Sequence, residues 1–301
     1  MPVALSYSIR KVLTYFDLFD YPLLKEEIVS FLDQPVHLDK LEEVLEQMLD
    51  EQSVFRYDDY YSIHKDNGRV MQRIAGNHRA QPLLRTGGRI SRFLYQVPYV
   101  RAIGISGSLS KNFAREDADI DYFIITRANR LWFARTLMHI FKKFSFLLGR
   151  QHWYCLNYYI DEEALEIEEK NIYTAIELIT LFPVCGNGIL HEFYRKNGWA
   201  NSFYPNYRLK IDDGDFSKTD SKLKRMLESL FSGRLGDWLD DYFMRVTSRR
   251  WKRKEARQKK SVKGARMGLH TGKHFSKPNP LFFQKEILDL YSEHLKRLST
   301  K

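Results

Sequence analysis

One short stretch of this chain carries a Gly-Ser pair and, after a gap of ten residues, two aspartates that open an apolar run. The pair is Gly107-Ser108, and the aspartates are Asp119 and Asp121. The apolar residues that follow predict a β-strand over 119–126 that is covered on both faces. Residues two apart in a strand share a face and lie about 7 Å apart. Both carboxylates can therefore bind one divalent cation.

The Gly-Ser pair has a different task. It ends an apolar strand predicted over 98–106 and opens a predicted helix, where free backbone N–H groups and the positive helix end favour a phosphate. One element thus supplies phosphate donors and the next supplies metal ligands, as phosphoryl or nucleotidyl transfer requires. The alternative is an ordinary turn followed by two solvated aspartates on an edge strand. The buried run after Asp121 favours the metal site, because unpaired buried charge is costly.

Order and spacing make this stretch resemble the nucleotidyltransferases of the DNA polymerase beta superfamily. Their signature is an apolar residue, Gly, Gly or Ser, a gap of about ten residues, then Asp, an apolar residue, Asp or Glu, and an apolar residue. The resemblance implies a small mixed sheet, an NTP substrate and Mg²⁺ or Mn²⁺ as cofactor. It also implies that Gly107, Ser108 and Lys111 bind the nucleotide, and that Asp119 and Asp121 are catalytic metal ligands.

A third carboxylate normally comes from a later strand of that superfamily, and here the pattern departs. In the strand predicted over 153–160, the expected position holds Asn157, which can ligate a cation through oxygen but cannot act as a base. Asp161, further along the same face, is the alternative ligand. We therefore expect Asn157 or Asp161 to complete the metal site.

The next segment, NIYTAIELITLFPVCG, predicts a helix in which Thr174 and Glu177 are three residues apart. This spacing favours a capping box at the start of the helix. The functional alternative places Glu177 near the acceptor. Together with Asn157-Tyr158 and the later His274-Phe275-Ser276-Lys277-Pro278-Asn279, the helix resembles uncharacterised bacterial nucleotidyltransferase-domain proteins along most of their length.

Three regions are expected. Residues 1–95 predict three helices and a hairpin at Asp58-Asp59, a winged-helix-like domain with a connecting helix. Residues 96–185 predict the α/β (α+β) nucleotidyltransferase core, and 186–301 a helical domain. A winged helix often binds DNA through its third helix, but residues 37–51 carry six acids and one lysine. Because such a helix repels phosphates, we do not expect duplex DNA and assign the domain to a protein partner or to substrate positioning.

The net charge of +10 is concentrated in one tract, residues 249–266, which holds ten Lys/Arg and one Glu. Solvated helices normally mix both signs, so this tract predicts contact with RNA or another polyanion. Trp251 inside it either stacks on a base or packs against a neighbouring helix. The residues expected to bind the polyanion are Lys252, Arg253, Lys254, Lys259 and Lys260.

Composition limits the class of protein. No apolar stretch reaches the length of a membrane span, and the N-terminal residues lack the pattern of a secretory signal, so we expect a soluble cytoplasmic protein without a membrane partner. The two cysteines, Cys155 and Cys185, are far apart and indicate neither a disulfide framework nor a zinc site.

The function expected from these patterns is metal-dependent transfer of a nucleoside monophosphate from an NTP to an unidentified acceptor. RNA is one candidate for that acceptor. Two alternatives remain open. One is a catalytically impaired nucleotide- or RNA-binding scaffold, which Asn157 favours. The other is a winged-helix transcription regulator, which the acidic third helix disfavours.

Overall fold

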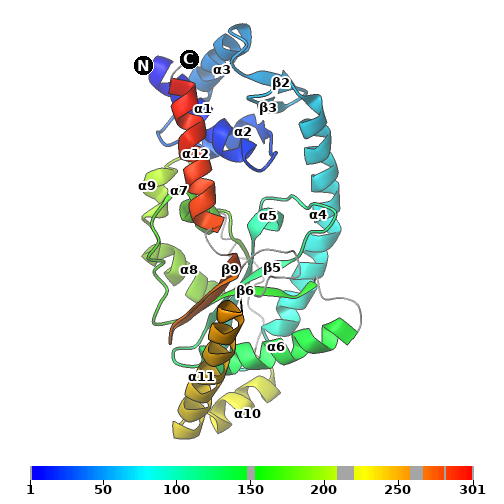
Figure 1. Cartoon of the computed structure of the whole chain (residues 1–301), viewed down its shortest axis with the longest axis vertical. Coiled ribbons are helices and arrows are strands. Elements are labelled where there is room, and N and C mark those ends of the chain that lie inside the picture. The colour runs from blue at the N-terminus through cyan, green and yellow to red at the C-terminus, as the bar shows by residue number, and fades with distance from the viewer. Residues whose placement is uncertain (1, 148–152, 209–219, 258–266, 281–282, 300–301) are drawn as a thin grey trace.

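The computed structural model describes residues 2–147, 153–208, 220–257, 267–280 and 283–299. Within these ranges the chain is mixed α and β, with twelve helices and a mixed six-stranded sheet at its centre (Figure 1). A smaller three-stranded sheet belongs to the N-terminal region.

The central sheet has the order β7-β4-β5-β6-β9-β8, in which β5 and β6 are parallel and all other neighbours are antiparallel. Strand β5 is buried on both faces, as its unbroken apolar run predicts, since Ile124 faces one core and Phe123 the other. The strands are β4 (Val100–Ser106), β5 (Asp121–Thr126), β6 (Cys155–Asp161), β7 (Phe182–Cys185), β8 (Met267–Thr271) and β9 (Phe275–Pro280).

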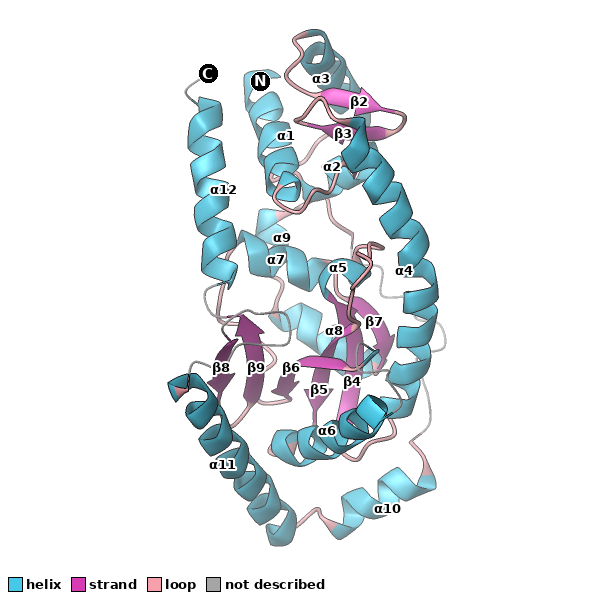
Figure 2. Ribbon diagram, turned by 45° about the vertical axis from the view of Figure 1, so that its right-hand side comes forward, coloured by secondary structure: helices cyan, strands magenta, loops and turns pink. Residues whose placement is uncertain are grey.

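Helices cover both faces of this sheet (Figure 2). Apolar residues of α6, the second half of α4 and α11 form the core on one face, and those of α7, α8 and α9 form the core on the other. The helices are α4 (Asn67–Leu94), α6 (Leu131–Leu147), α7 (Ile172–Ile179), α8 (Asn187–Lys196), α9 (Ala200–Phe203), α10 (Lys222–Leu230) and α11 (Arg234–Ala256).

The N-terminal region has the three helices and the hairpin that the sequence predicts. The hairpin turns at Asp58-Asp59, where Tyr57 pairs with Tyr60, and the small sheet has the order β1-β3-β2. The elements are α1 (Pro2–Asp17), β1 (Leu23–Leu24), α2 (Lys25–Phe31), α3 (Leu38–Asp50), β2 (Phe55–Tyr57) and β3 (Tyr60–Ser62).

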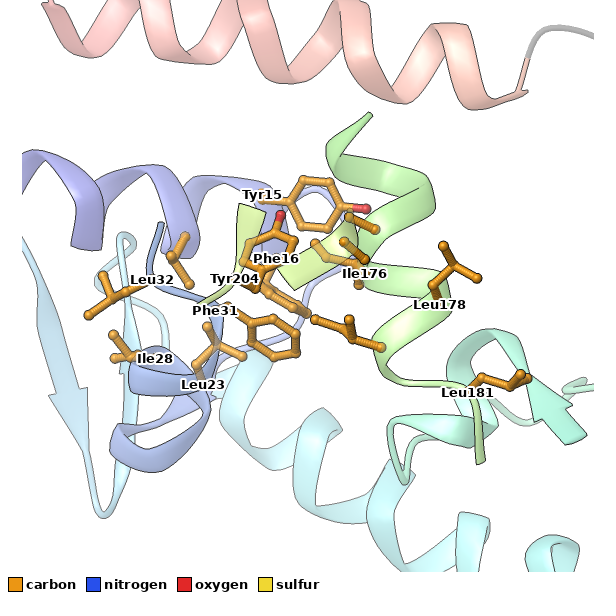
Figure 3. Close-up of a cluster of buried hydrophobic side chains, with 14 of the residues drawn as sticks. Tyr15, Phe16, Leu23, Ile28, Phe31, Leu32, Ile176, Leu178, Leu181 and Tyr204 are labelled. Carbon is orange, nitrogen blue, oxygen red and sulfur yellow. The ribbon is translucent and has the colours of Figure 1, made fainter. Parts of the chain in front are cut away.

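This region shares one apolar core with the helices on the central sheet. Phe16 and Phe31 of the N-terminal helices pack beside Ile176 of α7 and Tyr204 (Figure 3). Helix α12 (Phe283–Ser299) also returns to α1, where the rings of Tyr15 and Tyr291 lie 5.6 Å apart. Residues 2–95 are therefore fixed against the rest of the described chain by burial of apolar surface, not joined to it by a linker alone.

The prediction of a purely helical region over 186–301 is wrong, because β8 and β9 form a hairpin that extends the central sheet. Pro278 and Pro280 obscured this strand in the sequence. The structure accommodates them because β6 pairs only with Phe275 and Ser276 of β9, so both prolines lie beyond that contact. Within the same region, α10 and α11 are separate helices, divided at residues 231–233.

Within the described ranges, no helix has both the length and the apolar character needed to cross a membrane.

Candidate active site

The Gly-Ser turn and the second aspartate meet at one edge of the sheet. Ser106, the last residue of β4, pairs with Asp121, the first residue of β5. Gly107 follows with φ +71°, a left-handed conformation that costs a residue with a Cβ atom about 1–2 kcal/mol. A Cβ atom at this position would also lie 2.8 Å from Asp121 Oδ2. Position 107 therefore requires glycine both for its backbone conformation and for the close approach of the carboxylate.

The helix that opens at this turn is shorter than predicted. Helix α5 (Gly107–Ser110) is a single turn, so its dipole adds little to phosphate binding. Lys111 follows it directly, and its Nζ donates to the Gly107 carbonyl at 3.1 Å. Backbone N–H groups, the Ser108 hydroxyl and the Lys111 ammonium are consequently the groups that could hold a phosphate here.

Glu177 of α7 reaches into the same turn. One carboxylate oxygen pairs with Lys111 Nζ at 2.8 Å, and the other accepts from the Gly107 backbone N–H at 3.3 Å. The predicted capping box is wrong, because Asn171 caps α7 by accepting from the Thr174 N–H at 3.0 Å. Glu177 is thereby left to contact Gly107 and Lys111 of the turn.

These groups line two adjoining cavities. The larger has a volume of about 530 Å³ and the smaller about 170 Å³. Gly107, Asp121, Tyr173 and Glu177 line both of them. Further polar groups in the larger cavity are Ser108, Lys111 and Arg115, and its aromatic wall is formed by Tyr15, Phe16, Phe19, Tyr21, Phe113 and Phe283.

The aromatic wall was not found from the sequence. Its residues come from α1, the turn after α1, the loop after α5 and the start of α12, and no motif links them. A cavity with convergent polar groups at one end and apolar rings elsewhere is typical of a small-molecule site.

The electrostatics of the cavities are set by burial and by two carboxylates. Burial raises the pKa of Tyr173 well above its ordinary value, and the charges of Glu177 and Asp121 raise it further. Burial, and after it the Asp121 charge, raises the pKa of the Cys155 thiol to about 12. Both groups are therefore neutral at physiological pH, and the charged groups at the turn are Lys111, Asp121 and Glu177.

The prediction that the strand includes Asp119 is wrong, because β5 begins at Asp121; Asp119 lies in the loop before it and lines neither cavity. It is close enough to Cys155 for its charge to help raise the pKa of that thiol, as Asp121 also does. Asn157 lies between Leu156 and Tyr158 of β6, where the register of the β5–β6 pairing shifts by one residue. The structure does not describe the Asn157 side chain.

Asp161 does not belong to this site. In the parallel pair of β5 and β6, Asp121 lies opposite Cys155 and Asp161 lies opposite Thr126, so Asp161 is at the other end of the sheet, about 17–20 Å away. Its buried carboxylate accepts from the Asn129 and Glu163 backbone N–H groups and contacts His274 Nδ1 at 2.9 Å. The prediction that Asp161 could complete the metal site is wrong, because the register shift at Asn157 breaks the strand alternation, so that Asp161 lies not only at the other end of the sheet but also, like Thr126, on the opposite face from Asp121.

Residues of the N-terminal region hold the turn from the other side. The Tyr21 hydroxyl donates to the Lys111 carbonyl at 2.6 Å. The guanidinium of Arg73, only 2% exposed, lies over the Tyr21 ring and pairs with Glu27 at 2.7 Å. This buried cluster connects α2 and α4 to the segment that carries Lys111.

The basic tract lies apart from this site. Lys252, Arg253 and Lys254 are exposed on α11, which is on the opposite side of the central sheet from α5 in both views (Figures 1 and 2). Trp251 is buried and lies 4.8 Å from the Arg135 guanidinium, so it packs within the protein. Lys259 and Lys260 lie outside the described residues.

Among the side chains that the structure describes, no group of three or more His, Cys, Asp or Glu could hold a metal ion by itself. We found no match to this chain among protein-family models, curated proteins or solved structures. The function must therefore be argued from the geometry of the site.

Proposed function

We propose that this chain transfers a nucleoside monophosphate from an NTP to an acceptor hydroxyl in a Mg²⁺-dependent reaction. The observation that carries this proposal is the pairing of Ser106 with Asp121, which brings the Gly107 turn and a carboxylate to the wall of one cavity. Phosphate donors and a metal ligand then face the same space, as nucleotidyl transfer requires. The cavity volume of about 530 Å³ is within the range of small-molecule sites.

The donor set suits Mg²⁺ or Mn²⁺. Magnesium is commonly bound through one or two carboxylates, with substrate phosphates and water as its other ligands. Asp119 and Asp121 would provide two carboxylates, which fits that mode of binding. The ion would neutralise charge on the triphosphate and polarise the α-phosphorus.

Phosphate binding changes the contacts of the turn. The Glu177 carboxylate accepts hydrogen bonds from the Gly107 N–H and the Lys111 ammonium. Triphosphate oxygens would take over these two donors, together with the Ser108 hydroxyl. Glu177 is then released beside Asp121, at the junction of the two cavities.

The released carboxylate is placed to act as the base. Glu177 accepts the proton of the acceptor hydroxyl, the hydroxyl oxygen attacks the α-phosphorus, and pyrophosphate leaves. This assignment compensates for Asn157, whose amide cannot accept a proton at neutral pH. An acid from α7 thus supplies the charge that the superfamily pattern places on the later strand.

The N-terminal region supports the site and does not read DNA in this proposal. Its order of helices and strands is winged-helix-like, but the acidic residues of α3 point away from its buried Leu41, Val44 and Leu45 and would repel a duplex. Phe19 and Tyr21 from the same region line the cavity. The acidic face of α3 is left for a protein partner, and the exposed basic residues of α11 for RNA or another polyanion.

The test is transfer of label from each α-labelled NTP in the presence of Mg²⁺ and a cell extract as the source of acceptor. We expect one NTP to label one class of molecule and to release pyrophosphate. Glu177→Gln should lower the rate by about a hundredfold or more, because the base is lost. Glu166→Gln, which removes a solvated carboxylate paired with Lys170, is the matched control and should leave the rate unchanged.

A nucleotide that binds without any release of pyrophosphate would instead favour the catalytically impaired scaffold. Absence of both binding and turnover would reject nucleotidyl transfer and the scaffold together.

A further inference from the structure

Helices α10 and α11 carry a group of exposed apolar side chains, which we call the stripe. Each of these side chains is between 46% and 65% exposed. The rings of Trp238 and Tyr242 stack on each other at 5.6 Å, with 13° between their planes, and form a flat surface. The stripe consists of Leu223, Met226 and Leu230 on α10 and Leu235, Trp238, Tyr242 and Val246 on α11.

The spacing shows that the stripe is a second apolar face. On α10 the residues are three and four apart, and on α11 they follow at intervals of three, four and four, so each set lies on one side of its helix. The other side of α10 is already used, since the buried Lys224 donates to the Tyr95 and Val100 carbonyls. On α11, the buried Gly236 and Asp240 belong to the side that faces α6.

The area of the stripe is too large for an ordinary exposed surface. Seven half-exposed large side chains present roughly 100 Å² each, or about 700 Å² together, above the 300–600 Å² of the largest patch on a typical monomer. Two such stripes in contact would bury about 1,400 Å², which is within the range of a stable protein–protein interface. The stripe therefore has the area that a symmetric dimer needs.

The charges of α11 specify how two copies would pair. Its first ten residues hold three Asp and one Arg, and its remaining thirteen hold six Lys/Arg and one Glu. Antiparallel pairing about Trp238 and Tyr242 keeps the two basic halves at opposite ends of the helix pair, whereas parallel pairing would place them together. A two-fold axis produces the antiparallel arrangement, with the same patch on both copies.

We propose that a second copy of this chain covers the stripe, so that the protein forms a symmetric dimer through α10 and antiparallel α11 helices. The stacked Trp238 and Tyr242 are the central contacts, because large, rigid aromatic side chains dominate such interfaces. The dimer leaves the Gly107 turn free in both copies, since α11 and α5 lie on opposite sides of the sheet.

Sedimentation equilibrium of the full chain over a range of concentrations tests this proposal. We expect the wild type to show twice the chain mass of 35.8 kDa. Trp238→Glu should raise the dissociation constant by about a thousandfold, because both copies lose a central aromatic contact. Leu235→Glu, on the same stripe, should also dissociate the dimer. Met71→Glu is the matched control, since Met71 is 60% exposed on α4 and should leave the mass unchanged.

Cross-linking provides a second measurement that does not depend on affinity. Tyr242→Cys lies near the middle of the stripe and should join two copies through a short bifunctional thiol reagent, whereas Met71→Cys should not. Circular dichroism shows whether each variant is folded. A wild type that is monomeric at all concentrations would overturn the proposal, as would equal effects of Trp238→Glu and Met71→Glu.

Discussion

Replacing Gly107 with alanine tests the geometry of the turn without relying on any substrate. The backbone at this position has φ +71°, and forcing a residue with a Cβ atom into that region costs about 1–2 kcal/mol of stability. The new Cβ atom would also lie 2.8 Å from Asp121 Oδ2, closer than such atoms normally approach. Because the neighbour is the end of a side chain, it can move at little energetic cost. We therefore expect a modest loss of stability together with a displaced carboxylate.

Urea unfolding of Gly107→Ala and Gly88→Ala measures the first effect. Gly88 lies inside α4 with no atom within 4 Å of a Cβ position, so alanine there should stabilise the protein by about 0.5–1 kcal/mol. Gly107→Ala should consequently be less stable than the wild type and Gly88→Ala more stable, with free energies of unfolding that differ by about 2 kcal/mol.

The second effect is measured by the rise in melting temperature on adding Mg²⁺ and NTP. The wild type should be stabilised by binding, and Gly107→Ala should lose most of that rise because Asp121 has moved. If Gly107→Ala unfolds at the same urea concentration as the wild type and keeps the full rise, the turn does not constrain the carboxylate and our reasoning about the site is refuted.

Three other perturbations have defined outcomes. Asp119→Asn and Asp121→Asn should each abolish label transfer while keeping or raising the melting temperature, since one of two like charges is removed; near wild-type transfer in either would reject the metal assignment. Replacing Lys252, Arg253, Lys254, Lys259 and Lys260 with Gln should flatten the salt dependence of RNA binding. For the wild type we expect a slope of log K against log salt near −4, since each phosphate contact contributes about −0.7. An unaltered slope in the variant would assign RNA binding to another surface. Burial raises the pKa of Asp240 in the folded protein to about 6. The folded state therefore holds this proton more tightly than the unfolded state, and the free energy of unfolding falls as the pH rises from the unfolded pKa through 6. Asp240→Asn should remove up to about 3 kcal/mol of this change. If urea unfolding shows the same change in stability between pH 4 and pH 7 in the wild type and in Asp240→Asn, this prediction is contradicted.

The sequence predicted the strands and the turn of the site because these depend on local patterns. An apolar run with two aspartates at its start indicated β5, and a glycine at the end of another run indicated the turn at 107. Antiparallel pairing of the two strands then brings Gly107 to Asp121, and no distant residue is needed for that contact.

Contacts between distant segments could not be predicted in this way. Glu177 resembles a capping residue in the sequence, but Asn171 has already satisfied the end of α7. The distance from Asp121 to Asp161 depends on the parallel register of β5 and β6, which a pattern of alternation does not contain. Strand β9 was missed because its two prolines are acceptable only where β6 no longer pairs with it.

The return of α12 to α1 affects the order in which this protein matures. The Tyr291 hydroxyl donates to the Lys11 carbonyl, a contact between residues 280 positions apart. Phe283 and Ile287 of α12 form one side of the larger cavity, and Phe16 and Phe19 form another. During synthesis the ribosome exposes the Gly107 turn and β5 long before it releases α12. The cavity is therefore completed only after α12 has been synthesised, and a shorter nascent chain carries Gly107 and Asp121 without the enclosed cavity around them.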